Sequence, residues 1–120
     1  MDLERQISGL ALELVKTKQA SGGSEYRSFC EGFPTLLRSA GLAQTLAFLK
    51  AKGGCPHGDV YSHLEKHFEG LQLLPAGQAL LATVTDPRTL TPQYRLYSQL
   101  ALRMAFWHKR LAQALLEKRP

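Results

Sequence analysis

The chain has 120 residues, of which 44% are hydrophobic and 21% are charged, and its formal net charge is +5. This balance is typical of one soluble globular domain and excludes disordered and fibrous proteins, and no apolar run approaches the ~20 residues of a membrane span. Two cysteines are too few for a disulfide framework, and the start MDLERQ lacks the pattern of a signal peptide, so we expect a single cytoplasmic domain over residues 1–120.

The first half of the chain carries the pattern of three helices. Four apolar residues recur at spacings of four, three and four, as on one helix face: Leu3, Ile7, Leu10 and Leu14. The helix predicted over residues 2–18 ends before a Ser-Gly-Gly-Ser loop, whose last serine, Ser24, can cap a second helix over residues 25–40. Pro34 predicts a kink or a short break inside that helix. A third helix is expected over residues 42–52.

The second half continues the helical pattern. Asp59 can cap a helix over residues 59–69, and another is expected over residues 75–84. Thr91 can cap a long last helix over residues 92–118, with the following proline at its first position. Its predicted apolar stripe is formed by Leu96, Leu100, Met104, Trp107, Leu111 and Leu115. Because no segment alternates with period two, the sequence predicts an all-α protein, a single compact bundle of five to six helices with a long C-terminal helix and no sheet.

Catalytic and metal-binding patterns are weak. His63 and His67 share one helical face and could chelate a metal near Cys55 and His57, but the acid between them does not have metalloprotease geometry. A single cysteine beside a proline is not half of a paired-thiol zinc motif, so we interpret the histidines as lying on an exposed short helix. Nucleophile elbows and phosphate loops are also missing, and we expect no enzyme, no metal or other cofactor and no small-molecule substrate. A small metal-dependent hydrolase using His63 and His67 is the weakest alternative.

The positive charge is concentrated at the end of the chain. Up to Asp86 there are eight basic and nine acidic residues, a balance of −1, and beyond it there are seven basic residues and one acid, a balance of +6. Such an asymmetry indicates a polyanion, most simply nucleic acid, or an acidic protein surface as the partner. A solvated face that keeps the protein soluble is the structural alternative.

Most of this charge falls in one sector of the predicted last helix, beside its apolar stripe. At 100° per residue the sector contains Arg95, Gln99, Arg103, Phe106, Arg110 and Gln113, with Lys109 at its margin. Arginines and amides on a helix can contact phosphates and sugars without reading bases, and an aromatic side chain can stack on a base. Alternatively, Phe106 belongs to the core or to an interface and the arginines cover it with their apolar stems.

A second basic group is spread over the middle helices at Arg27, Arg38, Lys50 and Lys52. Lys50, Lys52 and Arg38 stand near predicted helix C-termini, where the helix dipole favours cations. Their positions therefore also have a purely structural explanation.

Residues 33–53, FPTLLRSAGLAQTLAFLKAKG, resemble a known family. A proline, an arginine-bearing turn and the pattern G-L-x-Q-x-L-A-F-L-x-x-K-G are typical of the small subunit of the type III-B CRISPR effector, the Cmr complex. A tyrosine before a long helix that ends in W-L-K-R-x-A is the second mark, matched from Tyr94 to the segment WHKRLA. Two residues depart from the pattern: His108 replaces the usual apolar residue, and Gln99 lies where an acid is common, which puts in doubt the salt bridge of that acid.

The resemblance implies a non-catalytic helical protein that stacks along the effector's RAMP subunits beside the paired guide RNA and target RNA. Its expected partners are the backbones of both RNAs, other effector subunits and further copies of itself, while guide pairing supplies the sequence specificity. Carried onto matching positions, the RNA-contacting residues are Arg38, Lys50, Lys52, Lys109 and Arg110. Arg27, Arg95 and Arg103 join them from charge geometry alone. A helical protein-interaction adaptor with a basic face for an acidic partner is the main alternative.

Overall fold

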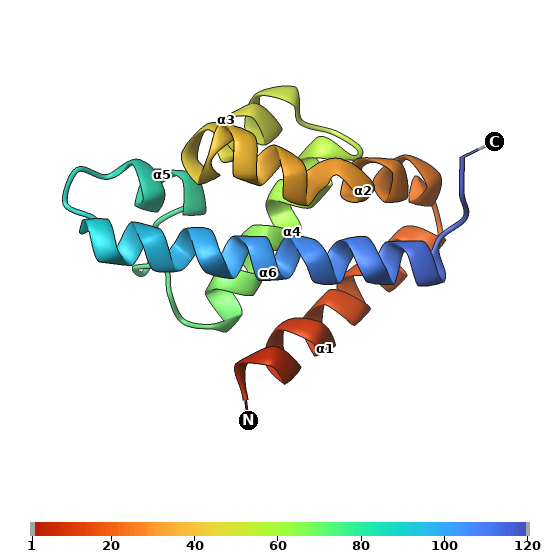
Figure 1. The fold of residues 1–120 in the computed structure, drawn as a ribbon, viewed down its shortest axis with the longest axis horizontal. Coiled ribbons are helices and arrows are strands. Elements are labelled where there is room, and N and C mark those ends of the chain that lie inside the picture. Colours follow the sequence, from red (N-terminus) through yellow and green to blue (C-terminus); the bar gives the residue numbers. More distant parts are fainter. Residues whose placement is uncertain (1, 120) are drawn as a thin grey trace.

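The computed structural model describes residues 2–119, which form six α-helices, one short 3₁₀ helix and no strand (Figure 1). In chain order the elements are α1 (Leu3–Lys16), η1 (Thr17–Gln19), α2 (Gly23–Ala40), α3 (Leu42–Lys52), α4 (His57–Gly70), α5 (Leu80–Thr85) and α6 (Thr91–Leu115). The predicted all-α fold with a long C-terminal helix is thereby confirmed. None of these helices combines the length and the apolar character needed to cross a bilayer.

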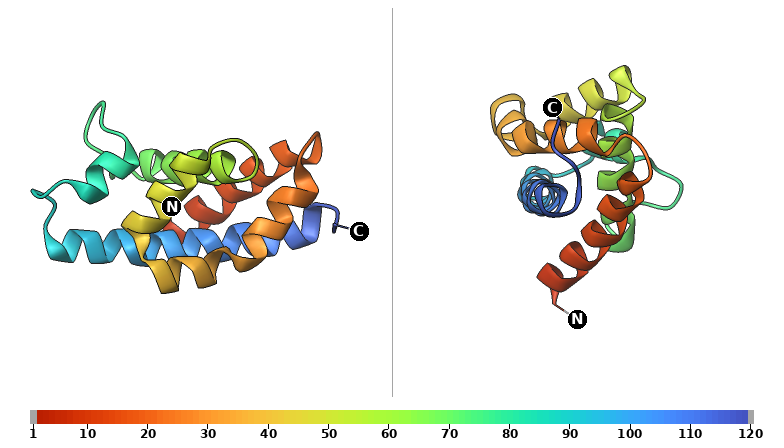
Figure 2. Two further views of the ribbon diagram at one scale, coloured as in Figure 1. Left: turned by 90° about the horizontal axis from the view of Figure 1, so that it is seen from above. Right: turned by 90° about the vertical axis from the view of Figure 1, so that its right-hand side faces the viewer.

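The longest helix, α6, is 25 residues long and extends along the length of the molecule (Figure 1). α2 and α1 make its most extensive contacts, and α3 packs on α4 and α5. Both views in Figure 2 place α1 and α4 on the same side of α6. The opposite side of α6 therefore faces outward, next to α2.

The core is formed by large side chains from several helices. Tyr26 and Phe33 of α2, Leu46 of α3 and Phe68 of α4 are each at most 1% exposed. α2 continues through Pro34, which is itself buried, so the break that was one alternative at this proline does not occur. A proline inside a helix costs about 3 kcal/mol, whereas each large buried apolar side chain contributes about 1.5 to 3 kcal/mol. Burial of the apolar face of α2 therefore outweighs the cost of the proline.

The buried face of α6 differs from the predicted stripe. Its buried residues are Tyr97, Leu100, Ala101, Met104, Ala105, His108 and Ala112. Leu96 is 45% exposed, and Trp107 is half-buried with its indole N–H donating to Glu4 Oε1 at 2.9 Å. The prediction counted only large apolar residues, but small alanines let neighbouring helices approach α6 closely and so turn its core face toward them.

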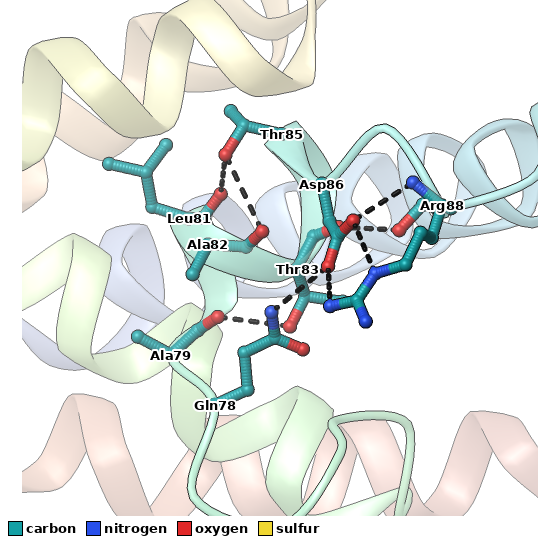
Figure 3. A network of polar contacts seen from close by, with 9 residues as sticks. Gln78, Ala79, Leu81, Ala82, Thr83, Thr85, Asp86 and Arg88 are labelled. Carbon is teal, nitrogen blue, oxygen red and sulfur yellow. Dashed lines mark hydrogen bonds and ion pairs between the residues drawn. The ribbon is translucent and has the colours of Figure 1, made fainter.

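The helix predicted over residues 75–84 is wrong in its first half, because α5 starts only at Leu80. Gly77 has a positive φ of 75°, and the preceding segment is a turn in which the Gln78 N–H donates to Pro75 O. After α5 the chain is held by Asp86, whose carboxylate accepts bonds from the backbone and guanidinium of Arg88 and from Gln78 (Figure 3). The side-chain bonds from Arg88 hold the pKa of Asp86 well below its usual range.

Two predicted starting points also shift. α2 starts at Gly23 rather than after Ser24, and its N-cap is Gly22 with φ 70°. A Cβ on Gly22 would lie 2.7 Å from Cys55 Sγ, so this turn requires glycine. α4 starts at His57 with Pro56 as its N-cap, so the predicted Asp59 cap is wrong; Asp59 lies in the first turn, where its carboxylate accepts a bond from Lys18 Nζ at 2.7 Å.

The C-terminal ends of the first and last helices also differ from the predicted ones. The segment predicted as one helix over residues 2–18 is α1 followed by η1, while α1 itself is capped by Asp2, which accepts a bond from the Arg5 N–H at 2.8 Å. The last helix starts at Thr91 with Leu90 as its N-cap, so the predicted Thr91 cap is wrong, and it stops at Leu115 rather than at residue 118. The Arg27 side chain of α2 binds two backbone carbonyls at the C-terminal end of α6.

Candidate nucleic-acid interface

The outward side of α6 is basic and contains no acid. Arg95, Gln99, Arg103 and Arg110 are exposed, and Lys109 is half-buried at the margin, as the predicted sector requires. Between Thr91 and Leu115 the sequence has no aspartate or glutamate. Positive charge is thus presented along one face without a compensating acid on the same helix.

α2 adds Arg38 to this face. The Arg38 guanidinium carbon lies 5.2 Å from the centre of the Phe106 ring, close enough for a cation–π contact. Phe106 is half-buried, so it belongs to the α2–α6 contact and its ring is covered by an arginine, as the structural alternative described. We call the set Arg38, Arg95, Gln99, Arg103 and Arg110 the α2–α6 basic surface.

Acids from α1 and α2 lie beside this surface, namely Glu4 and Glu31. Glu31 accepts a bond from Gln113, the partner of Arg110. Arg103 donates to Glu4 Oε2 of α1 at 3.0 Å, and the two side chains are 57% and 50% exposed. An ion pair so open to water contributes at most about 1 kcal/mol. Arg103 can therefore exchange Glu4 for a phosphate at little cost.

Lys50 and Lys52 lie apart from the α2–α6 basic surface. α3 meets α6 at its N-terminal end, where the Ala43 N–H donates to Tyr94 Oη at 3.0 Å, and α3 then extends away from α6 (Figures 1 and 2). Lys50 Nζ lies 4.8 Å from the centre of the Tyr61 ring of α4, and Lys52 is exposed. The structure therefore divides the candidate residues into two sets.

Arg27 is engaged inside the molecule. Its NH1 group donates to Gln113 O at 3.2 Å and to Leu116 O at 3.0 Å, where α6 ends. A cation that binds the free carbonyls of a helix C-terminus satisfies them and matches the helix dipole. This contact accounts for the end of α6 and gives Arg27 a structural role.

We expect Arg27→Met to lower the free energy of unfolding by about 2 to 3 kcal/mol, because bonds to charged groups contribute about 1.5 to 3 kcal/mol and the methionine leaves two carbonyls without a partner. Urea unfolding followed by circular dichroism measures this loss. The exposed Arg38→Met is the matched control and should lose less than about 1 kcal/mol. Equal losses in the two variants would contradict the capping role.

The histidines form a buried network, so their predicted exposure is wrong. His63, His67 and His108 are 7%, 1% and 3% exposed. Tyr26 Oη lies 2.7 Å from His63 Nδ1 and 2.8 Å from His108 Nδ1, and His108 Nε2 lies 2.8 Å from His67 Nε2. Burial lowers the pKa of His63 and of His67 to about 4 and lowers that of His108 well below its usual value. The four side chains connect α2, α4 and α6 through neutral hydrogen bonds.

A signal for this network was present in the sequence. His63 and His67 share their helical face with Val60, Leu64 and Phe68, which is an apolar and hence buried face. Among residues 2–119, no group of three or more histidine, cysteine or acidic side chains is arranged to hold a metal.

Six helices and an outward basic side on the longest of them define a small all-helical protein with one basic face. Residues 3–115 match the family described as CRISPR-associated protein (Cas_Cmr5). The chain belongs to this Cmr5 family, which confirms the resemblance found in residues 33–53.

Two relatives show how far the likeness extends. A protein of Thermus thermophilus named CRISPR system Cmr subunit Cmr5 is 32% identical over 100 residues, which cover 83% of this chain and 82% of the relative. The crystal structure of a CRISPR-associated Cmr5 family protein from Thermus thermophilus superposes with a TM-score of 0.81 and 27% identity, over 98% of this chain and 99% of that one. The fold is therefore shared over nearly the whole length.

Proposed function

We propose that the chain is a structural, non-catalytic subunit of a cytoplasmic Cmr CRISPR complex and that it binds the backbone of guide RNA and target RNA through the α2–α6 basic surface. The relative from Thermus thermophilus carries the name of a Cmr subunit, and family membership supports the same role for this chain. In this role the protein orders RNA and supports neighbouring subunits, while guide pairing supplies specificity.

The observation that carries the RNA proposal is the row of arginines on α6, a helix that has no acid of its own. Arg95, Arg103 and Arg110 follow one another at intervals of eight and seven residues, so they stand about 12 and 10 Å apart along the helix. Arginines placed in a row on a rigid helix can contact successive phosphates of a strand without reading its bases. This is the kind of contact that a guide-programmed complex needs.

Lys109 extends this surface, and Lys50 with Lys52 forms the second set of proposed RNA contacts. Contacts with neighbouring subunits, further copies of the chain included, are proposed for other exposed surfaces. Two exposed apolar residues are candidates: Phe48 of α3 is 41% exposed, and Leu90 before α6 is 69% exposed. Arg27 is left out of the RNA contacts because its guanidinium binds the end of α6.

The salt dependence of RNA binding tests the α2–α6 basic surface. Each phosphate contact contributes about −0.7 to the slope of log K against log salt for a single strand. We expect the triple variant R38Q/R95Q/R110Q to bind single-stranded RNA at least tenfold more weakly at low salt and to flatten this slope by about 2. The control R5Q/K16Q/K66Q removes as many exposed charges from α1 and α4, and its slope should stay within about half a unit of the wild-type slope.

The outcomes separate phosphate contact from the alternatives. If the slope of log K against log salt flattens equally in the two triple variants, RNA is attracted by net charge alone, which would contradict a defined binding surface. Weak, salt-independent binding by the wild-type protein would favour the adaptor with an acidic protein partner. The pair variant K50Q/K52Q tests the second set in the same titration. Reconstitution with the partner subunits and guide RNA then measures whether the same substitutions lower target affinity.

A further inference from the structure

A shallow groove lies between α6 and the junction of α2 and α3. It has a volume of about 260 Å³, and its lining includes Leu37, Arg38, Leu42, Tyr94, Gln99 and Leu102. This volume is below the ~300–1,000 Å³ of sites for drug-sized ligands, so the groove has room for one small, flat group. Its leucines make the floor apolar, and the bond from the Ala43 N–H to Tyr94 Oη fixes the tyrosine ring in the wall.

The groove opens onto the α2–α6 basic surface. Gln99 belongs to both, and it stands one helical turn from Arg95 and one turn from Arg103 on the same face of α6. A strand whose phosphates lie on these two arginines passes the mouth of the groove. The groove is thus placed beside the path proposed for the RNA backbone.

Arg38 brings a planar cation to the edge of the groove, since Phe106 stands one helical turn from the lining residue Leu102. The guanidinium is held near the Phe106 ring, and Arg38 is also part of the groove lining. Unpaired RNA bases stack on guanidinium planes and on aromatic rings, and an amide such as that of Gln99 can both donate to and accept from a base edge.

We infer that this groove receives one unpaired nucleobase of an RNA strand, with the base stacked on Arg38 and its edge facing Gln99. The inference rests on the proposed RNA-binding function and adds the place where the protein contacts a base. Charge favours this occupant over an apolar protein side chain. Arg38 lines the groove, Arg95 and Arg103 each stand one helical turn from the lining residue Gln99, and α6 carries no acid. A nucleotide brings both the flat apolar ring and the negative charge that such a site requires.

The test compares single-stranded RNA with an abasic oligomer that has the same length and the same ribose-phosphate backbone. Two variants of the full chain are titrated with both by fluorescence anisotropy. Arg38→Lys keeps the charge and loses the plane, and Ser98→Phe fills the groove beside Tyr94. Because stacking on one base is lost, we expect each variant to bind RNA about fivefold or more weakly and to bind the abasic oligomer within about twofold of the wild-type protein.

Ser62→Phe, which adds the same ring at an exposed position of α4, is the control and should match the wild-type protein. Equal losses for RNA and the abasic oligomer would overturn the inference, because the groove would then hold backbone. Unchanged affinity for both would also overturn it and would leave the groove to an apolar side chain of a protein partner. If the wild-type protein binds neither oligomer, the proposed function itself fails. Arg38 is exposed, so R38K decides the matter even if Ser98→Phe does not fold.

Discussion

Lowering the pH from about 7 to about 4 should unfold the protein, because three histidines are buried without charge. The folded protein keeps the pKa of His63 and of His67 at about 4, mainly through burial, whereas the unfolded chain protonates them near their ordinary value of 6.5. Between pH 6.5 and pH 4 the unfolded state binds more protons than the folded state, so the free energy of unfolding falls as the pH falls through this window. Above pH 6.5 both states leave these histidines neutral, and the free energy of unfolding does not depend on them. Each shift corresponds to about 3 kcal/mol, and a typical domain is stable by only about 5 to 15 kcal/mol.

An acid titration followed by the helical circular dichroism signal measures this transition. The double variant H67L/H108L removes both ends of the 2.8 Å bond between the two Nε2 atoms, and replacing both partners by apolar groups can be nearly neutral at pH 7. Tyr26 Oη also loses its bond to His108 Nδ1 but keeps the one to His63 Nδ1, so its hydroxyl still has a partner. We expect its acid midpoint to move to lower pH, because two of the three groups that must be protonated are gone. An unchanged midpoint would assign the acid transition to carboxylates such as Asp59, whose pKa is lowered by its bond from Lys18.

The helices with strong local signals were predictable from the sequence. Asp2 caps α1, and the Thr91 start of α6 is set by the proline that follows it, since capping and proline geometry depend only on near neighbours. The helix expected over residues 75–84 was wrong for an equally local reason. Pro75 and Gly77 together favour a turn, and the apolar residues that follow were counted as part of a longer helix than the turn allows.

The outward face of α6 was also predictable, but its neighbours were not. Helical periodicity places Arg95, Arg103 and Arg110 in one sector without knowledge of the fold. Arg38 and Arg27 both stand on α2, but Arg38 joins this face whereas Arg27 binds the C-terminal end of α6. This difference depends on how α2 lies along α6. Charge counting treats them alike. Only the tertiary structure separates a residue free for a ligand from one used to end a helix.

The histidine network is a second feature, this time in the core, that the sequence pattern did not predict. Tyr26, His63 and His108 come from three different helices, and each is polar, so a search for apolar stripes passes over all three. Sequence periodicity could have marked their positions as buried, but their partners are separated by 37 and 82 residues. A buried polar side chain is tolerated only with such partners, and the sequence alone does not name them.

Tyr26→Phe should therefore be among the most costly single substitutions in this protein. Tyr26 is fully buried, and its hydroxyl has one proton, so it donates to one of His63 and His108 and accepts from the other. Removing the hydroxyl leaves both Nδ1 atoms without a partner in the core. Since each buried orphan costs about 1 to 3 kcal/mol, we expect a loss of about 2 to 5 kcal/mol in the free energy of unfolding.

Tyr97→Phe is the matched control, because the Tyr97 hydroxyl donates to Leu73 O at 2.8 Å and accepts a long bond of 3.4 Å from the exposed Gln93, whose amide can turn to water instead. It should lose about 1 kcal/mol, which corresponds to a fall of about 4 °C in Tm, against a fall of about 10 °C or more for Tyr26→Phe. Calorimetry at neutral pH compares the two directly, and equal losses would mean that water replaces the Tyr26 hydroxyl. The larger loss instead identifies Tyr26 as the link between α2 and the histidines of α4 and α6, and so as a residue that holds the basic helix in place.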